Sequence, residues 1–136
     1  MGDRSVTQKI LLYIEDNLYK ELSLDRIAGE FSYSKFYIAR AFKEHTGMTL
    51  HKYIQGRRLD EAAGKLAGSD QPIVDIALEA GYSSQQAFTQ AFRCRYLCTP
   101  QEYRRISTMF PGQGDKYTRI KDITHSFKMK GDRTAA

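Results

Sequence analysis

The sequence predicts an all-α protein of about seven helices. Three observations support this fold class. Apolar residues recur at three- and four-residue spacings, residues that cap helices separate these segments, and one pattern of residues occurs twice. No convincing alternation of apolar and polar residues, which would indicate a β-strand, is present before Thr108.

The first part of the chain predicts three short helices. They are expected over residues 6–18, 24–31 and 35–45. Ser23 and Ser34 are suitable N-caps for the second and third of these helices, because a serine hydroxyl can accept a free backbone N–H of the first turn. The third helix is expected to end before Gly47.

The second part of the chain predicts four further helices. They are expected over residues 50–67, 73–80, 84–96 and 100–106. Thr49, Ser83 and Thr99 are the expected N-caps, and Thr99 begins a Thr-Pro-Gln-Glu capping box with proline at the first helical position. Gly68 is expected to end the long helix.

These segments predict two subdomains joined by a long linker helix. The expected boundaries are 6–48 for the first subdomain, 49–68 for the linker helix, 69–107 for the second subdomain and 108–136 for a basic tail. The Pro-Gly-Gln-Gly run at 111–114 separates the tail from the helices. We expect the tail to be either disordered or the remnant of an effector domain.

The repeated pattern is a short helix, a tight turn and a second helix. The matching pairs are Ile27-Ala28 with Ile76-Ala77, Tyr33-Ser34 with Tyr82-Ser83, Ala41-Phe42 with Ala91-Phe92, Thr49 with Thr99, and Tyr53 with Tyr103. The offset changes by one residue between the two halves of the match. This layout is that of a helix-turn-helix, and it occurs twice.

The helix-turn-helix interpretation makes demands on particular positions. Ala28 and Ala77 are small residues where the second helix must cross closely. The turn needs a positive φ, which Gly81 adopts freely and which costs Ser32 about 1 kcal/mol. The alternative reading of the repeat is a plain helical bundle that arose by duplication.

Composition and charge favour an acidic partner. The net charge is +5 and the pI is about 9.2, which is typical of a chain that binds nucleic acid or an anionic surface. No apolar run is long enough to span a bilayer and the N-terminus has no apolar core of a signal peptide, so we expect no membrane association and a cytoplasmic protein.

Catalytic and metal-binding patterns are not apparent in the sequence. Cys94 and Cys98 are expected to be reduced core thiols, and the three histidines are scattered. No carboxylate pair, nucleophile–base spacing or phosphate-binding glycine loop is present. We therefore expect neither an enzyme nor a cofactor or metal site.

The chain also resembles a known family over about residues 6–106. The motifs are Ile-Glu-Asp-Asn-Leu at 14–18, Tyr-Ser-Lys-Phe at 33–36, Tyr-Ile-Gln-Gly-Arg-Arg-Leu at 53–59, Ser-Gln-Gln-Ala-Phe-Thr at 84–89 and Thr-Pro-Gln-Glu-Tyr-Arg-Arg at 99–105. Their order and spacing are similar to the AraC/XylS transcription regulators, above all to the small stand-alone activators of the multiple-antibiotic-resistance and superoxide-response type.

In a helix-turn-helix the second helix enters the major groove of DNA. The expected base-contacting residues are Phe36, Ala39 and Arg40 in the first unit and Gln85, Gln86, Thr89 and Gln90 in the second. Arginine can donate two hydrogen bonds to guanine, glutamine can bind adenine, and an apolar ring can contact a thymine methyl. For Phe36 a place in the core is the alternative.

The resemblance supports all of these base contacts except Thr89, and the chain departs from the family at three of the positions. Ala39 stands where the small activators usually carry glutamine, Gln90 where they usually carry arginine, and Phe36 where they usually carry tryptophan. The resemblance therefore implies a shared mode of binding, but not a shared base preference.

Phosphate contacts would position these helices and make affinity depend on salt. The candidates are Ser34, Lys35, Lys43, Lys52, Arg57, Arg58, Ser83, Arg93 and Arg95. The two serines are included because free N–H groups at a helix N-terminus favour an anion. The alternative for each charged residue is a solvated surface position.

The expected function is a sequence-specific regulator that binds double-stranded DNA as a monomer. Two unlike units on one chain predict an asymmetric site of about two turns of duplex. The joining helix is roughly 27 Å long, which is shorter than the ~34–36 Å repeat of the groove, so we expect either bent DNA or partial engagement of one unit. The resemblance implies an activator that contacts RNA polymerase. The alternatives are the DNA-binding part of a longer ligand-responsive regulator, a repressor and an architectural protein.

Overall fold

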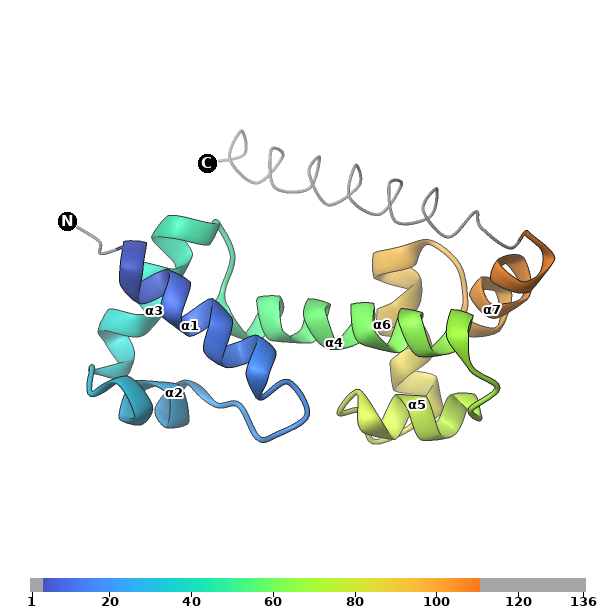
Figure 1. Ribbon diagram of the computed structural model, residues 1–136, viewed down its shortest axis with the longest axis horizontal. Helices are drawn as coiled ribbons and strands as arrows, with labels where there is room; N and C mark the ends of the chain where they lie inside the picture. Colours follow the sequence, from blue (N-terminus) through green and yellow to red (C-terminus); the bar gives the residue numbers. More distant parts are fainter. Residues whose placement is uncertain (1–3, 111–136) are drawn as a thin grey trace. The chain divides into compact units, whose positions relative to one another are not determined.

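The computed structural model describes residues 4–110 of the chain (Figure 1). Within this range it contains seven α-helices and no strand, which confirms the all-α class. The helices are α1 (Arg4–Asp16), α2 (Leu24–Phe31), α3 (Lys35–Thr46), α4 (Leu50–Gly68), α5 (Ile73–Glu79), α6 (Gln85–Tyr96) and α7 (Pro100–Met109). The expected tail begins inside α7, and its residues from 111 onward lie outside the described range.

The chain divides into two units between Arg58 and Leu59, a point inside α4. Leu50, at the start of α4, is buried in the core of the first unit. Leu66, near its end, is buried in the core of the second. The helix expected as a linker over residues 49–68 therefore also completes both cores.

The core of the first unit lies where α1 and α2 pack against α3. One apolar face of α1 is buried there, as its three- and four-residue spacing predicts. The buried residues are Val6, Ile10 and Ile14 from α1, Leu18 just after α1, Ile27 and Ala28 from α2, Ile38 and Phe42 from α3, and Leu50 and Ile54 from α4. Ile27 and Phe42, two residues of the repeated pattern, are fully buried in this core.

The core of the second unit has the same plan, and aromatic rings dominate it. Phe88 and Phe92 of α6 are fully buried, as is Ile76 of α5. Tyr96 stacks on Phe92 with ring centroids 4.6 Å apart, and Tyr103 of α7 packs edge-on against Phe92 at 5.5 Å. Such offset and edge-on pairs add stability beyond the area that they bury.

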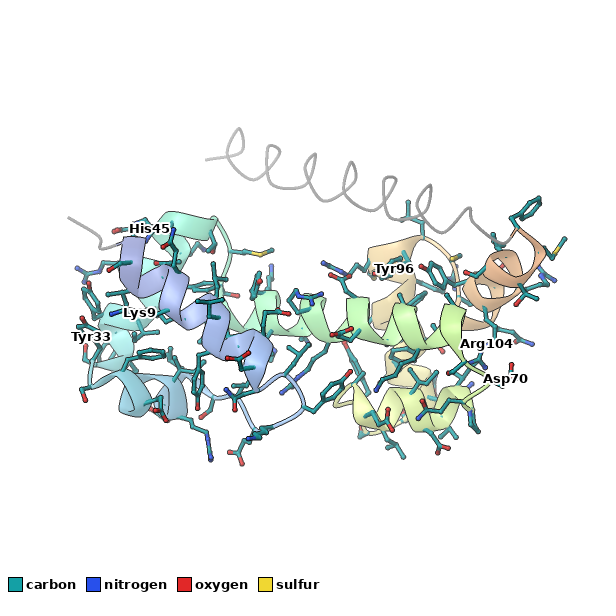
Figure 2. All side chains as sticks on the ribbon, viewed as in Figure 1. Lys9, Tyr33, His45, Asp70, Tyr96 and Arg104 are labelled. Atoms are coloured by element: carbon teal, nitrogen blue, oxygen red, sulfur yellow. The ribbon has the colours of Figure 1, made fainter. Side chains whose placement is uncertain are left out.

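An arginine from the last helix of each unit binds the backbone at, or just after, the C-terminal end of the unit's first helix. The guanidinium groups of Arg58 in α4 and Arg104 in α7 each donate two hydrogen bonds to backbone carbonyls. Arg104 is labelled in Figure 2. The acceptors are Leu18 (2.9 Å) and Lys20 (2.8 Å) for Arg58, and Leu66 (3.0 Å) and Gln71 (2.7 Å) for Arg104. Leu66 lies in the last turn of α4, where carbonyls have no intrahelical donor, whereas Leu18, Lys20 and Gln71 lie in the segments that follow α1 and α4.

The turn of each helix-turn-helix has the positive φ that the repeat predicts. Ser32 has φ 59° and ψ 36°, and Gly81 has φ 95°. The same backbone hydrogen bond closes both turns, from Tyr33 N–H to the Ala28 carbonyl at 3.0 Å and from Tyr82 N–H to the Ala77 carbonyl at 3.1 Å. The two turns are therefore equivalent, although only one of them has glycine.

The N-cap of α6 corrects the sequence analysis. Ser84, and not the predicted Ser83, has the extended backbone of a cap, and its hydroxyl accepts the N–H of Ala87 at 3.1 Å. Tyr33 aligns with Tyr82, but the cap that follows comes one residue later in the second unit. Ser83 is therefore the extra residue that shifts the offset of the repeat.

The other predicted caps are confirmed, and several helix ends differ by a few residues. Ser23, Ser34 and Thr49 each accept a backbone N–H of the following turn, and Thr99 forms the predicted capping box. α1 ends at Asp16, α4 includes Gly68, α5 ends at Glu79 and α7 continues to Met109. Helix ends depend on local hydrogen bonds that periodicity does not specify.

We predict that Ser32→Gly stabilises the first unit. A residue with a side chain is strained at this left-handed position, and relief of the strain outweighs the larger entropy that glycine gives the unfolded chain. The expected gain is about 0.5–1 kcal/mol in the free energy of unfolding, measured by denaturant titration.

Ser32→Ala is the matched control, because it removes the hydroxyl but keeps the Cβ in the left-handed conformation. It should leave the midpoint nearly unchanged. A loss of stability in both variants would show that the serine hydroxyl, and not backbone strain, controls this turn.

Candidate nucleic-acid interface

The second helix of the first helix-turn-helix, α3, has one buried and one exposed face. Ser34 fixes its start by accepting the Tyr37 N–H at 3.1 Å, and Gly47 ends it in a left-handed conformation. Ile38, Ala41 and Phe42 are buried. The three predicted base-contacting residues of this unit, Phe36, Ala39 and Arg40, are all exposed.

Phe36 does not belong to the core. It is 74% exposed, the most of the exposed large apolar residues in the described range, which excludes the alternative interpretation of Phe36 as a packing residue. The ammonium of Lys35 lies 5.8 Å from the centre of its ring and 3.7 Å from a carboxylate oxygen of Asp25. An exposed ring beside a cation suits contact with the face or edge of a base.

The second helix of the second helix-turn-helix, α6, has the same division into a buried and an exposed face. Phe88 and Phe92 are buried, whereas Gln85, Gln86 and Gln90 are exposed. Thr89 is half-buried, so it is the least accessible of the residues predicted to contact bases. Because Ser84 caps α6, the first two glutamines occupy the first turn of the helix, from which side chains enter a groove most readily.

Six of the nine predicted phosphate contacts lie exposed on the surface. They are Ser34, Lys35, Lys43, Lys52, Ser83 and Arg93. Ser34 caps α3 and Ser83 directly precedes the cap of α6, so both lie beside free N–H groups that attract an anion.

Arg57 and Arg58 have partners inside the first unit. Arg57 donates two hydrogen bonds to the carboxylate of Glu15, at 2.7 and 2.8 Å. Arg58 forms the backbone contacts at the end of α1 that are described above. These bonds use two of the five N–H donors of each guanidinium and hold it against its own unit. Both residues therefore serve the fold of the unit, a role that the sequence analysis did not assign to them.

Arg95 is likewise engaged inside the second unit. Its Nε and Nη2 donate to the two carboxylate oxygens of Asp60, at 2.9 and 3.0 Å. The hydroxyl of Tyr96, which is labelled in Figure 2, donates to Asp60 at 2.6 Å. Although burial opposes its charge, the hydrogen bond and charge of Asp60 keep the pKa of Arg95 above its ordinary value. Burial, and then the Asp60 carboxylate, raise the pKa of Tyr96.

Sequence reasoning missed Glu15, Asp60 and Tyr96. Their partners lie 35 to 42 positions away along the chain, so no helical spacing brings them together. The only available signal was an acidic residue on the helix that precedes each helix-turn-helix, Glu15 on α1 and Asp60 on α4, and this does not identify the arginine that it faces.

The cysteines differ from the sequence interpretation. Cys94 is exposed, so it is not the core thiol that was expected, and Cys98 is half-buried. Burial, with the charge of Glu102, raises the pKa of the Cys98 thiol. Within residues 4–110, no group of three or more histidine, cysteine or acidic residues is arranged to hold a metal ion. No helix in this range is both long and apolar enough to cross a membrane.

Comparison with known proteins identifies the same residues as a domain. The model of a helix-turn-helix domain matches residues 27–106. Transcriptional regulator Rob of Salmonella typhimurium is 40% identical over 107 residues, which cover 79% of this chain and 37% of Rob. Regulatory protein SoxS of Escherichia coli is 38% identical over 104 residues, which cover 76% of this chain and 97% of SoxS. The chain therefore matches a little over a third of the length of Rob.

A solved structure has the same fold. It is a transcriptional regulator from Chromobacterium violaceum, described as an AraC-type protein with a DNA-binding domain. The two share 31% identity with a TM-score of 0.75, and the match covers 82% of this chain and 98% of that one. The motifs, the repeated helix-turn-helix and these similarities agree: the chain belongs to the AraC/XylS family of helix-turn-helix DNA-binding transcription regulators.

Proposed function

We propose that this chain is a sequence-specific regulator of transcription that reads DNA through two recognition helices, α3 and α6. The observation that carries the proposal is the repeated division of faces. In α3 and in α6 one face is buried in the core of its unit. The opposite face exposes, in the N-terminal half of the helix, side chains suited to contact base edges. Family membership supports the same role for both helices.

The two recognition helices differ in chemistry, so they should prefer different bases. In α3, Arg40 can donate two hydrogen bonds to a guanine edge, and the exposed ring of Phe36 can pack on a thymine methyl. In α6, Gln85, Gln86 and Gln90 provide amides that can pair with adenine. The site on DNA is therefore expected to be asymmetric.

Phosphate contacts are assigned to the exposed set only. We expect Lys43 and Arg93 to contact phosphates beside the recognition helices, and Ser34 and Ser83 to lie near phosphates at the helix N-termini. Lys35 and Lys52 complete this set. Arg57, Arg58 and Arg95 are left out, because each already binds groups within its own unit.

The proposal extends to the finer role of the chain. We expect a monomer on DNA, a location in the cytoplasm, activation through contact with RNA polymerase, and no catalytic activity. The match to about a third of Rob supports a second candidate, in which the same residues form the DNA-reading part of a longer regulator. Both candidates bind DNA in the same way.

We predict that Gln86→Ala and Lys43→Ala weaken binding in different ways. Gln86→Ala should remove about 1–3 kcal/mol of discrimination at one or two base pairs and leave binding to random DNA unchanged. Lys43→Ala should weaken binding to all sequences alike and lower the slope of log K against log salt by about 0.9. The measurement is fluorescence anisotropy on a site selected from random DNA, with variant sites and a salt series.

Glu44→Ala is the control for these two variants, because Glu44 is an exposed residue of α3 that is not expected to contact DNA. Equal affinity of the wild-type chain for selected and random DNA would instead support the architectural alternative.

We predict that Phe36→Ala impairs binding without loss of stability. Removal of an exposed ring should change the free energy of unfolding by less than about 0.5 kcal/mol, whereas affinity for the selected site should fall roughly fivefold. Phe42→Ala, at a fully buried position of the same helix, should cost about 3–5 kcal/mol of stability. A stability loss in Phe36→Ala as large as in Phe42→Ala would contradict this assignment.

We predict a complex of one chain with one DNA duplex of about 20 base pairs, since each chain carries both recognition helices. Sedimentation equilibrium with labelled duplex should give the mass of a 1:1 complex at all protein concentrations near saturation. A complex that forms only with two chains would contradict the monomer.

A further inference from the structure

Three side chains join α4 to the C-terminal end of α6. The carboxylate of Asp60 accepts both donors of the Arg95 fork and also the hydroxyl of Tyr96. Only 12% of the Asp60 side chain and 21% of the Arg95 side chain are exposed. A two-pronged bond between planar groups fixes orientation as well as distance, so it restricts the direction in which α6 can leave α4.

This network lies on the side of α6 that faces away from the expected DNA. Successive residues of a helix are about 100° apart, so Arg95 lies about 180° around α6 from Gln86. Arg93, by contrast, lies within about 20° of Gln86 and is exposed. Arg95 therefore cannot follow Gln86 into the same groove, and its contacts act on the placement of the helix.

The first unit has a contact at the equivalent position, but different side chains form it. His45, near the end of α3, aligns with Arg95 when Ala41-Phe42 is aligned with Ala91-Phe92. The hydroxyl of Thr7, a buried residue of α1, lies 2.6 Å from Nδ1 of His45. Each unit thus ties the C-terminal end of its recognition helix to the helix that precedes its helix-turn-helix, α3 to α1 through one hydrogen bond and α6 to α4 through three.

We propose that Asp60 is a positioning residue for DNA reading, which sets the angle of α6 so that its N-terminal glutamines reach the base edges. The proposal rests on the function proposed above. From Gln85 to Tyr96 the axis of α6 is about 16 Å long, so a tilt of about 4° about its C-terminal end moves the first turn by roughly 1 Å. A shift of that size breaks a two-pronged amide–base contact.

The test uses Asp60→Asn, which keeps the size of the side chain but replaces an acceptor of Arg95 with a donor. Gln86→Ala first identifies the base pairs that α6 reads, within a site selected from random DNA. Asp60→Asn should then lower affinity for that site about tenfold, leave affinity for random DNA within about twofold, and abolish preference at those base pairs alone. Base pairs that Arg40→Ala identifies as read by α3 should keep their preference.

Ile76→Val is the control for a loss of stability. It removes one methyl group from the same core and leaves the Asp60 network intact. All variants are compared at a temperature where circular dichroism shows them folded. The same loss of preference in Ile76→Val would overturn the proposal, because reading would then depend on the stability of the unit in general.

Arg95→Met and Arg95→Lys separate a tie from a phosphate contact. If Arg95 positions α6, both variants lose the two-pronged bond, and the salt dependence of binding stays at the wild-type slope. If Arg95 contacts a phosphate, Arg95→Met lowers that slope by about 0.9 and Arg95→Lys retains it, which overturns the proposal.

The outcomes for the two proposals are distinct. A wild-type chain without preference among DNA sequences removes the proposed function itself. A wild-type chain with a preference that Asp60→Asn leaves unchanged at the α6 base pairs removes the positioning role alone.

Discussion

Each unit is organised by the burial of one face of its recognition helix, α3 in the first unit and α6 in the second. In α3 the buried residues are Ile38, Ala41 and Phe42, and in α6 they are Phe88, Phe92 and Tyr96. A helix turns by about 100° per residue, so fixing these side chains inward also fixes which positions point to solvent. The exposed stripes that we propose as DNA-reading surfaces are therefore set by the packing of the aromatic residues behind them.

The two units keep one plan but realise it with different chemistry. Positive φ in the turn comes from Gly81 in one unit and from a strained Ser32 in the other. The second unit also has an extra residue, Ser83, before the N-cap of α6. At the C-terminal end of α6 it has the charged network of Asp60, where the equivalent end of α3 has a single hydrogen bond between Thr7 and His45. The shared geometry has thus been retained while the side chains that support it and those proposed to read DNA have diverged.

Local order was predictable from the sequence, and long-range pairing was not. Apolar spacing and caps such as Ser23 and Thr99 predicted seven helices, because these signals act within a few residues. The exposed ring of Phe36 and the partners of Arg57, Arg58 and Arg95 depend on how helices face one another. The sequence alone does not distinguish an arginine that binds a phosphate from one that pairs with a carboxylate of its own chain.

The division of the chain inside α4 limits how such proteins can be recombined. A cut that follows the ends of helices would take Leu59 and Leu66 from the second core, or Leu50 from the first. A chimera that exchanges one DNA-reading unit between relatives must therefore cross over within this helix, at the boundary between Arg58 and Leu59. For the same reason, a fragment made to carry a single unit needs its own share of α4.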